Sequence, residues 1–132
     1  MSAVEPHVGP GEEHPLSAVS QARANISRRI VRLHKEYYGK GPDKAKTYLD
    51  GDAVLVILRG GFTRVEQTLL DEGHGRAVIE QRMQFQEVMR DRFIEVIVRE
   101  TGREVVAFMS GSHQDPDLLA EVFVLEASDL TD

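Results

Sequence analysis

Residues 26–70 read ISRRIVRLHKEYYGKGPDKAKTYLDGDAVLVILRGGFTRVEQTLL, and this stretch decides the fold. In residues 44–49 the side chains alternate with a period of two, which is typical of a strand with one face in water. Asp50-Gly51 then signals a tight turn, because glycine tolerates the positive φ that hairpin turns need. Residues 53–58 are apolar at every position, as in a strand that is central or covered on both faces. The stretch therefore predicts a β-hairpin.

An amphipathic helix is expected before this hairpin, from Ser17 to about Tyr38. Its apolar residues recur at steps of three and four positions, which places them on one face. They are Val19, Ala22, Ile26, Ile30, Leu33 and Tyr37. Gly39, Gly41 and Pro42 end the helix, since glycine adopts the left-handed cap conformation and proline cannot continue the hydrogen-bond ladder.

Two more helices are expected after the hairpin. Residues 63–66, TRVE, have the form of a capping box that opens a short helix to about Asp71. A longer helix then runs from about Arg76 to Glu100 and stops at Gly102. Its predicted inner face carries Phe85, Val88, Met89, Phe93, Val96 and Ile97. Its predicted outer face carries Arg82, Arg90, Asp91, Arg99 and Glu100.

A second hairpin closes the chain, with strands predicted at residues 104–109 and 118–126 and a loop at residues 110–117. The fold class is therefore α+β: a four-stranded antiparallel sheet from two hairpins, with helices packed mainly on one face. We expect one domain over residues 16–127, a flexible tail at residues 1–15 and a frayed acidic end at residues 128–132. The matched order of helix and hairpin also suggests an internal repeat of residues 20–59 and 84–126.

Composition limits the classes of function. The chain has no cysteine, which excludes disulfides, thiolate metal sites and a thiol nucleophile. The N-terminus lacks the basic and apolar regions of a secretory signal, and the longest apolar run falls far short of the ~20 residues that span a bilayer. We therefore expect a soluble cytoplasmic protein without direct membrane insertion.

Positive charge is concentrated between Arg23 and Lys46. Eight basic residues stand there against two acidic ones, a local balance of +6 within a chain of net charge -6. Such an asymmetry steers anionic partners or favours self-association. The candidate anion- or partner-binding residues are Arg28, Arg29, Arg32, Lys35, Lys40, Lys44 and Lys46. The alternative interpretation is a solvated helix face without a ligand.

Catalytic and metal chemistry have weaker support. The bend at residues 39–46 is rich in glycine and lysine, but it lacks the end of a P-loop and leads into a strand, so it suggests only a small-anion or nucleotide-phosphate site. His113, Asp115 and Asp117 are weak metal candidates, because the same residue types form ordinary turns. No pair or triad indicates a catalytic centre, so we expect no enzyme and no cofactor.

The combination of HKEYYGKGPDKAKTY at residues 34–48 with VVAF at residues 105–108 and the DPD of residues 115–117 resembles the MpsC family. The resemblance covers about residues 20–126. The family is named for a sodium-translocating, membrane-potential-generating system whose other components look like membrane transport proteins associated with inorganic-carbon uptake. The resemblance implies a soluble accessory or regulatory role.

The leading expectation is therefore a non-enzymatic accessory or regulatory protein that acts through protein contacts, with membrane transport proteins as partners. A small-anion or nucleotide sensor using the bend at residues 39–46 is one alternative. A nucleic-acid or ribosome-associated protein using the basic first helix is another, because Tyr37 and Tyr38 lie close to the positive charge. A homodimer is expected, because the charge asymmetry favours self-association and a second copy would cover the fully apolar strand of this small chain.

Overall fold

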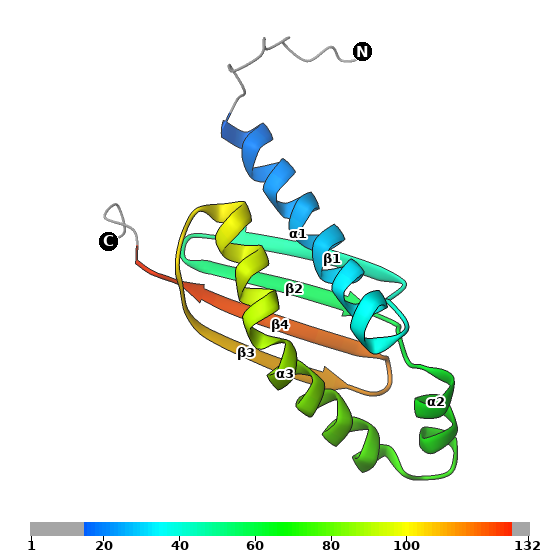
Figure 1. The fold of residues 1–132 in the computed structure, drawn as a ribbon. Helices are drawn as coiled ribbons and strands as arrows, with labels where there is room; N and C mark the ends of the chain where they lie inside the picture. The colour runs from blue at the N-terminus through cyan, green and yellow to red at the C-terminus, as the bar shows by residue number, and fades with distance from the viewer. Residues whose placement is uncertain (1–14, 128–132) are drawn as a thin grey trace, which may run out of the picture.

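Residues 15–127 are described by a computed structural model that contains three helices and four strands (Figure 1). Residues 1–14 of the predicted tail and all of the predicted acidic end lie outside the described residues. The elements, in chain order, are α1 (Pro15–Tyr38), β1 (Lys44–Asp50), β2 (Ala53–Arg59), α2 (Arg64–Asp71), α3 (Gly75–Thr101), β3 (Val105–His113) and β4 (Leu118–Leu125).

The four strands form one antiparallel sheet in the order β1-β2-β4-β3. The predicted α+β class with two hairpins is confirmed, and β2 lies in the centre of the sheet as its apolar sequence indicated. At the first turn Asp50 pairs with Ala53, and Gly51 has a φ of 58°. A side chain with a Cβ would be strained there, which is why the turn uses glycine.

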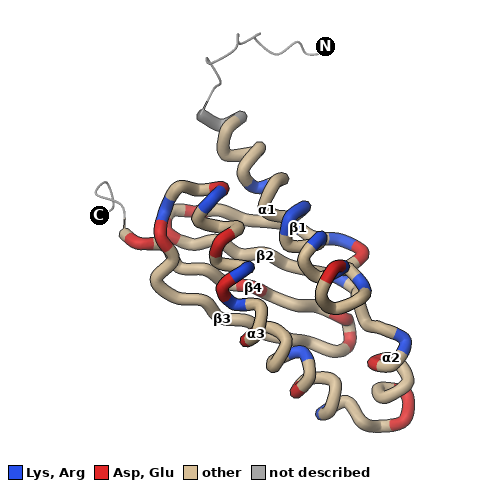
Figure 2. Tube along the Cα trace, in the orientation of Figure 1, with Lys and Arg blue, Asp and Glu red and all other residues tan. Residues whose placement is uncertain are grey.

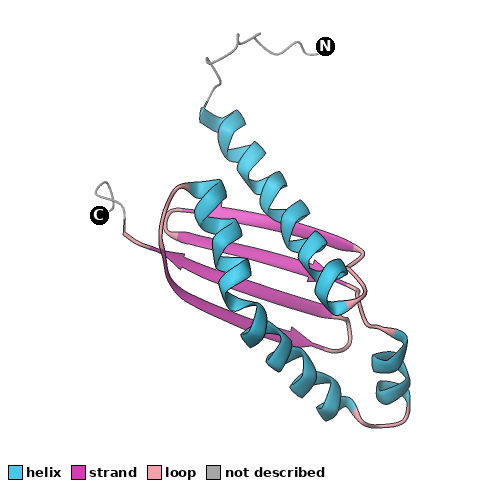
Figure 3. Cartoon of the chain, in the orientation of Figure 1, coloured by secondary structure: helices cyan, strands magenta, loops and turns pink. Residues whose placement is uncertain are grey.

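The helices α1 and α3 cross the same face of the sheet, as Figure 3 shows, and run in opposite directions. The short helix α2 lies beside the start of α3. The capping box predicted from the sequence is confirmed, because the Thr63 hydroxyl accepts from the Glu66 amide and the Glu66 carboxylate accepts from the Thr63 amide. Gly102 ends α3 in the left-handed conformation, also as expected.

The hydrophobic core fills the space between the helices and the sheet. Every second side chain of the two central strands points into it and is buried, while α1 and α3 supply the opposing apolar groups. The buried apolar side chains of the core are Ile26, Ile30, Val54, Val56, Leu58, Met89, Phe93, Val96, Ile97, Leu119, Phe123 and Leu125. This single cluster fixes both long helices on the sheet.

Two predictions for the face of α3 are wrong. The sequence predicts Val88 on the inner face, but it is 71% exposed, and it predicts Arg82 on the outer face, but it is only 3% exposed. The buried residues of α3 form a regular stripe that includes Arg82 and Gln86. Apolar periodicity missed this stripe because polar side chains occupy two of its positions, and Arg82 is charge-compensated by residues from other elements.

Two smaller predictions also differ from the structure. Tyr37 was placed on the inner face of α1 and is 46% exposed, while His34 takes the buried position. The predicted loop of residues 110–117 is too long, since β3 continues to His113. Ser110 and Ser112 pair with Glu121 and Leu119 of β4, and this pairing outweighs the low strand preference of small polar residues.

The arrangement of elements fits the suggested internal repeat. Each unit consists of a helix and a hairpin, and β2 and β4 meet antiparallel in the middle of the sheet. Because α1 and α3 also run antiparallel (Figure 1), an approximate two-fold axis between β2 and β4 would relate the two units. The duplication itself stays a prediction.

The neighbours Met89 and Val88 provide a direct test of the observed face of α3. Replacing the buried Met89 with alanine should lower the free energy of unfolding by roughly 2–5 kcal/mol, because it leaves a cavity in the core. Val88→Ala should change it by no more than about 0.5 kcal/mol, as expected for an exposed position. Urea denaturation followed by circular dichroism measures both. Equal losses for the two variants would contradict the face assignment.

Candidate functional site

A basic groove of about 640 Å³ lies between α1 and β1. Its α1 wall contains Arg23, Ala24, Ser27, Arg28, Val31, Arg32 and Lys35, and its β1 wall contains Ala45, Lys46 and Thr47. Five of these side chains are basic and none is acidic. Lys and Arg positions recur along α1 in Figure 2. The lining suits an anionic ligand or a partner segment rich in carboxylates.

The groove follows from helical spacing beside an edge strand. One side of α1 lies next to the free edge of the sheet. The residues on this side recur at three- and four-residue steps: Ala24, Ser27, Val31 and Lys35. The Ser27 and Thr47 hydroxyls lie 2.8 Å apart and join α1 to β1. This hydrogen bond holds the basic helix over the edge strand.

Contacts with α3 fix the other side of α1. The Arg29 guanidinium donates to Glu100 at 3.0 Å, and the Asn25 amide donates to the second Glu100 oxygen at 3.0 Å. Arg29 was predicted as a binding residue, but its charge is directed to the helix–helix contact and it does not line the groove. Arg32 lines both the groove and a second hollow of about 260 Å³ between α1 and α3.

The predicted binding residues therefore separate into two sets. Arg28, Arg32, Lys35 and Lys46 line the groove. Arg29, Lys40 and Lys44 do not. The Lys40 ammonium lies 3.7 Å from an Asp43 oxygen, while Lys44 is exposed at the start of β1. Arg23 was missing from the predicted set, although its place four residues before Ser27 on the same helix could have found it.

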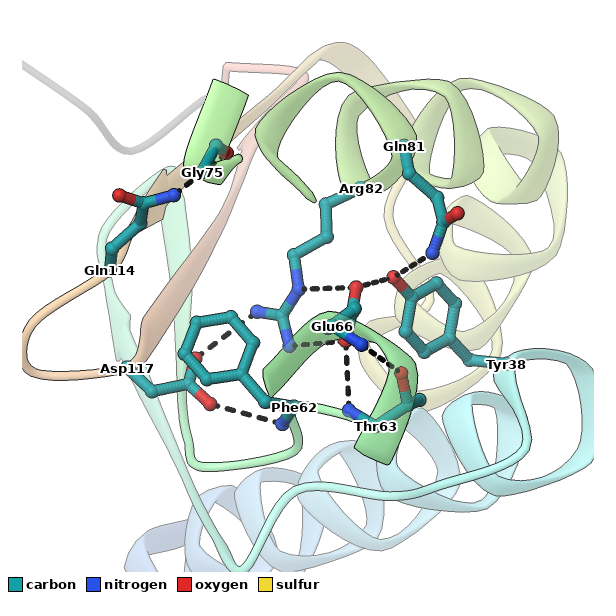
Figure 4. A network of polar contacts seen from close by, with 9 residues as sticks. All are labelled: Tyr38, Phe62, Thr63, Glu66, Gly75, Gln81, Arg82, Gln114 and Asp117. Carbon is teal, nitrogen blue, oxygen red and sulfur yellow. Dashed lines mark hydrogen bonds and ion pairs between the residues drawn. The ribbon is translucent and has the colours of Figure 1, made fainter. Parts of the chain in front are cut away.

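A buried polar network anchors the C-terminal end of α1 (Figure 4). The Arg82 guanidinium of α3 donates to both carboxylate oxygens of Glu66 in α2, at 3.2 and 3.3 Å. It also donates to Asp117 at 3.1 Å, and its central carbon lies 4.2 Å from the centre of the Phe62 ring. The Tyr38 hydroxyl donates to Glu66 and accepts from Gln81, so the last turn of α1 joins the same network.

The charges within this network compensate one another. Burial by itself raises the pKa of Glu66, but the hydrogen bonds from Arg82, Tyr38 and Thr63 hold that pKa below its ordinary value. Burial, together with the Glu66 carboxylate, raises the pKa of Tyr38 to about 12. Glu66 is therefore ionised and Tyr38 neutral at physiological pH, and the network acts as a structural anchor.

Neither the aromatic residues near the groove nor the metal candidates point to a ligand. The central guanidinium carbon of Arg92 lies 4.6 Å from the centre of the Tyr37 ring, and the Tyr38 hydroxyl donates to Glu66 in the buried network. His113 bonds the Pro116 carbonyl at 2.8 Å, while Asp117 pairs with Arg82 and accepts from the Phe62 amide. His113, Asp115 and Asp117 thus do not form a metal-binding group, and residues 15–127 contain no group of three or more candidate ligands.

A second buried acid lies under α3. The Glu121 side chain points from β4 toward the helices, is 0% exposed, and neither of its carboxylate oxygens has a hydrogen-bond partner among the described residues. Burial raises the pKa of Glu121 to about 8. Both amide atoms of the buried Gln86 also lack partners in this part of the structure. Glu121 is therefore mostly protonated at neutral pH.

Comparison with known protein families gave a match that covers most of the chain. The model of a family described as "Na+-translocating membrane potential-generating system (MpsC)" matches residues 19–127, which include the groove and the buried network. No curated protein and no solved structure matched the chain. In the described part of the chain, none of the three helices combines the length and hydrophobicity of a membrane span.

Replacing Arg82 with methionine should lower the free energy of unfolding by about 3–5 kcal/mol, because Glu66 and Asp117 would stay buried without a compensating charge. Arg82→Lys should lie between methionine and the parent, since an ammonium keeps the charge but loses the two-pronged contact. Urea denaturation measures the losses. Arg76→Met, at an exposed position of α3, is the matched control and should change little. A loss below about 1 kcal/mol for Arg82→Met would contradict the anchoring role.

Glu121 should make stability depend on pH. Its pKa is raised from the ordinary 4.5 to about 8 on folding, so its stabilising contribution is complete below the ordinary value and declines as the pH rises to about 8. The free energy of unfolding should fall by up to about 1.4 kcal/mol per pH unit within that window. Glu121→Gln should remove this component, whereas Glu87→Gln, at an exposed position of α3, should retain it. Urea denaturation from pH 4 to 9 measures the difference; parallel curves for Glu121→Gln and the parent would refute it.

Proposed function

The chain belongs to the MpsC family, and on that premise we propose that it is a non-enzymatic accessory protein of a membrane-potential-generating system, acting through protein contacts. The basic groove between α1 and β1 is the observation that supports this proposal. Its occupant is an acidic segment of another component of the system. The proposal keeps two expectations from the sequence, a cytoplasmic location and self-association.

The chemistry of the groove favours carboxylates. Three arginines and two lysines line it, and guanidinium groups bind carboxylates through two parallel hydrogen bonds. Single exposed ion pairs contribute little, about 0–1 kcal/mol each, so binding requires several charges acting together. A segment with several acidic residues meets that requirement. Arginine clusters recognise acidic motifs in other proteins in this way.

The shape of the groove favours an extended segment. The strand β1 is an edge strand with seven residues, so its outer backbone groups have no neighbouring strand within the sheet. An extended peptide can pair with such an edge and place alternate side chains beneath the basic side of α1. Regulation then consists of occupying or vacating this edge.

A peptide-binding assay tests the proposal. A labelled ten-residue glutamate-rich peptide should bind at low salt, and its affinity should fall as the salt concentration rises, because charge pairs supply the binding. The double variant Arg28→Glu, Arg32→Glu should weaken binding at least about tenfold, or about 1.4 kcal/mol. Fluorescence anisotropy measures the affinity.

The matched control is the double variant Arg76→Glu, Arg90→Glu, which makes the same charge change on α3 away from the groove. It should retain the affinity of the parent. Equal weakening by both variants would indicate an effect of net charge and would refute the groove. If the protein preferred single-stranded RNA, a nucleotide or anionic lipid vesicles in the same assay, the proposal that the groove binds an acidic segment would be wrong.

A photo-crosslinking amino acid at Ala24 connects the groove with the cellular system. Ala24 is exposed and lines the groove. Its position therefore tolerates the substitution, and the crosslinking group can reach the ligand in the groove. We expect crosslinks to a membrane transport subunit that disappear in the Arg28→Glu, Arg32→Glu background. The same group at Gln84, an exposed position of α3, should not give that product.

A further inference from the structure

Within residues 15–127, no helix or loop covers the face of the sheet opposite α1 and α3. Side chains of the four strands that point to this outer sheet face are exposed or half-buried, and none is buried. Its apolar members are Tyr48, Ala53, Leu55, Ile57, Ala107, Met109, Leu118, Ala120, Val122 and Val124. Tyr48 is 47% exposed and Met109 is 54% exposed. Contiguous apolar surface across four strands marks an interaction site on a protein of this size.

The strand register arranges this face in rows that cross the sheet. One row consists of large side chains: Tyr48 lies opposite Leu55, Leu55 opposite Val122, and Val122 opposite Met109. In the adjacent row Lys46 lies opposite Ile57, Ile57 opposite Ala120, and Ala120 opposite Gly111. The first row is a ridge. The second row has large residues on β1 and β2 but small ones on β4 and β3, so it forms a shallow trough over the β4–β3 half of the face.

The two ends of the outer sheet face carry opposite charge on the β1 side. Lys44 and Arg59 are paired at one end, while Asp50 lies at the other end, next to the hairpin turn. All three are exposed. A surface with a ridge beside a trough, and with basic and acidic ends, can complement a second copy of itself.

We propose that two copies of this chain pack face to face through their outer sheet faces, related by a two-fold axis that runs parallel to the rows. With the axis between the two rows, the β4–β3 half of one copy's ridge lies over the trough of the other copy. Val122 then faces the partner's Ala120, and Met109 faces the partner's Gly111. Asp50 comes over the partner's Lys44, and symmetry repeats each contact. Two sheets packed in this way form the aligned sandwich common among β proteins.

The helices α1 and α3 lie on the far side of each sheet in this dimer, and most of each groove stays open to its ligand. The inference deepens the self-association that is part of the proposed function, but it needs no acidic ligand. The experiments below use no peptide and leave the α1 wall of the groove unchanged, so a failure of the dimer and a failure of groove binding are distinguishable.

Analytical ultracentrifugation of the full chain tests the dimer. The mass should move from monomer to dimer as the protein concentration rises, and Met109→Lys should shift the transition to at least about tenfold higher concentration, because the ridge then carries an unpaired charge. Val88→Lys, an exposed apolar residue of α3, is the matched control and should dimerise like the parent. Circular dichroism and thermal unfolding confirm that each variant is folded.

A charge exchange tests the predicted geometry. Lys44→Glu alone and Asp50→Lys alone should each weaken self-association, because like charges meet twice in each symmetric dimer. An equimolar mixture of the two variants should form a heterodimer, because glutamate at position 44 of one copy faces lysine at position 50 of the other, and the second contact retains its original pair. Native mass spectrometry distinguishes the heterodimer from the homodimers.

Two outcomes would overturn the proposal. A parent chain that remains monomeric up to about millimolar concentration would leave the outer sheet face to another occupant, either residues 1–14 of the chain or a different protein. A dimer that Met109→Lys leaves unchanged, and whose charge variants do not recover on mixing, would place the contact elsewhere on the molecule.

Discussion

The buried guanidinium of Arg82 is the interaction on which the arrangement of the other elements depends. It pairs with Glu66 of α2 and with Asp117, the residue that precedes β4, and Glu66 in turn accepts from Tyr38 at the end of α1. Residues from three helices and from the second hairpin thus form one hydrogen-bonded network around the Arg82 charge. Because a buried ion is costly without partners, only an arrangement that brings all of these groups together is stable. The network therefore disfavours any arrangement that leaves one of its buried charges without a partner.

Local signals made the turns and the helix ends predictable. The turn at Gly51, the capping box of Thr63 and Glu66, and the glycine cap at Gly102 act within a few residues, so the sequence displays each of them in full. The face of α3 depends on distant partners instead. Arg82 is buried because Glu66 and Asp117 compensate its charge, and these partners lie 16 and 35 residues away in the sequence. No local pattern reveals those pairings. Apolar periodicity consequently placed Val88 inside and Arg82 outside.

The candidate site shows the same division. Helical spacing put Arg28, Arg32 and Lys35 on the surface of α1, where the structure also has them. The role of Arg29 was not predictable, because its partner Glu100 lies 71 residues away in the sequence. Lys46 joins the groove only because α1 packs across β1. The distribution of charge in the sequence located the basic segment. The packing of α1 on β1 and α3 determines which of its basic side chains line the groove.

The two surfaces inferred for this protein differ in the physical force that acts on them. The groove on the helix side gathers positive charge and binds through long-range attraction, which salt weakens. The outer sheet face gathers apolar side chains and associates through burial, which salt affects little. The two surfaces share Lys46 at the edge of the sheet, but the α1 wall of the groove lies on the helix side. Association through the outer sheet face therefore leaves that wall accessible and presents two grooves together. A partner with two acidic segments would then bind both grooves of one dimer. Its apparent affinity would rise with the fraction of the protein that is dimeric.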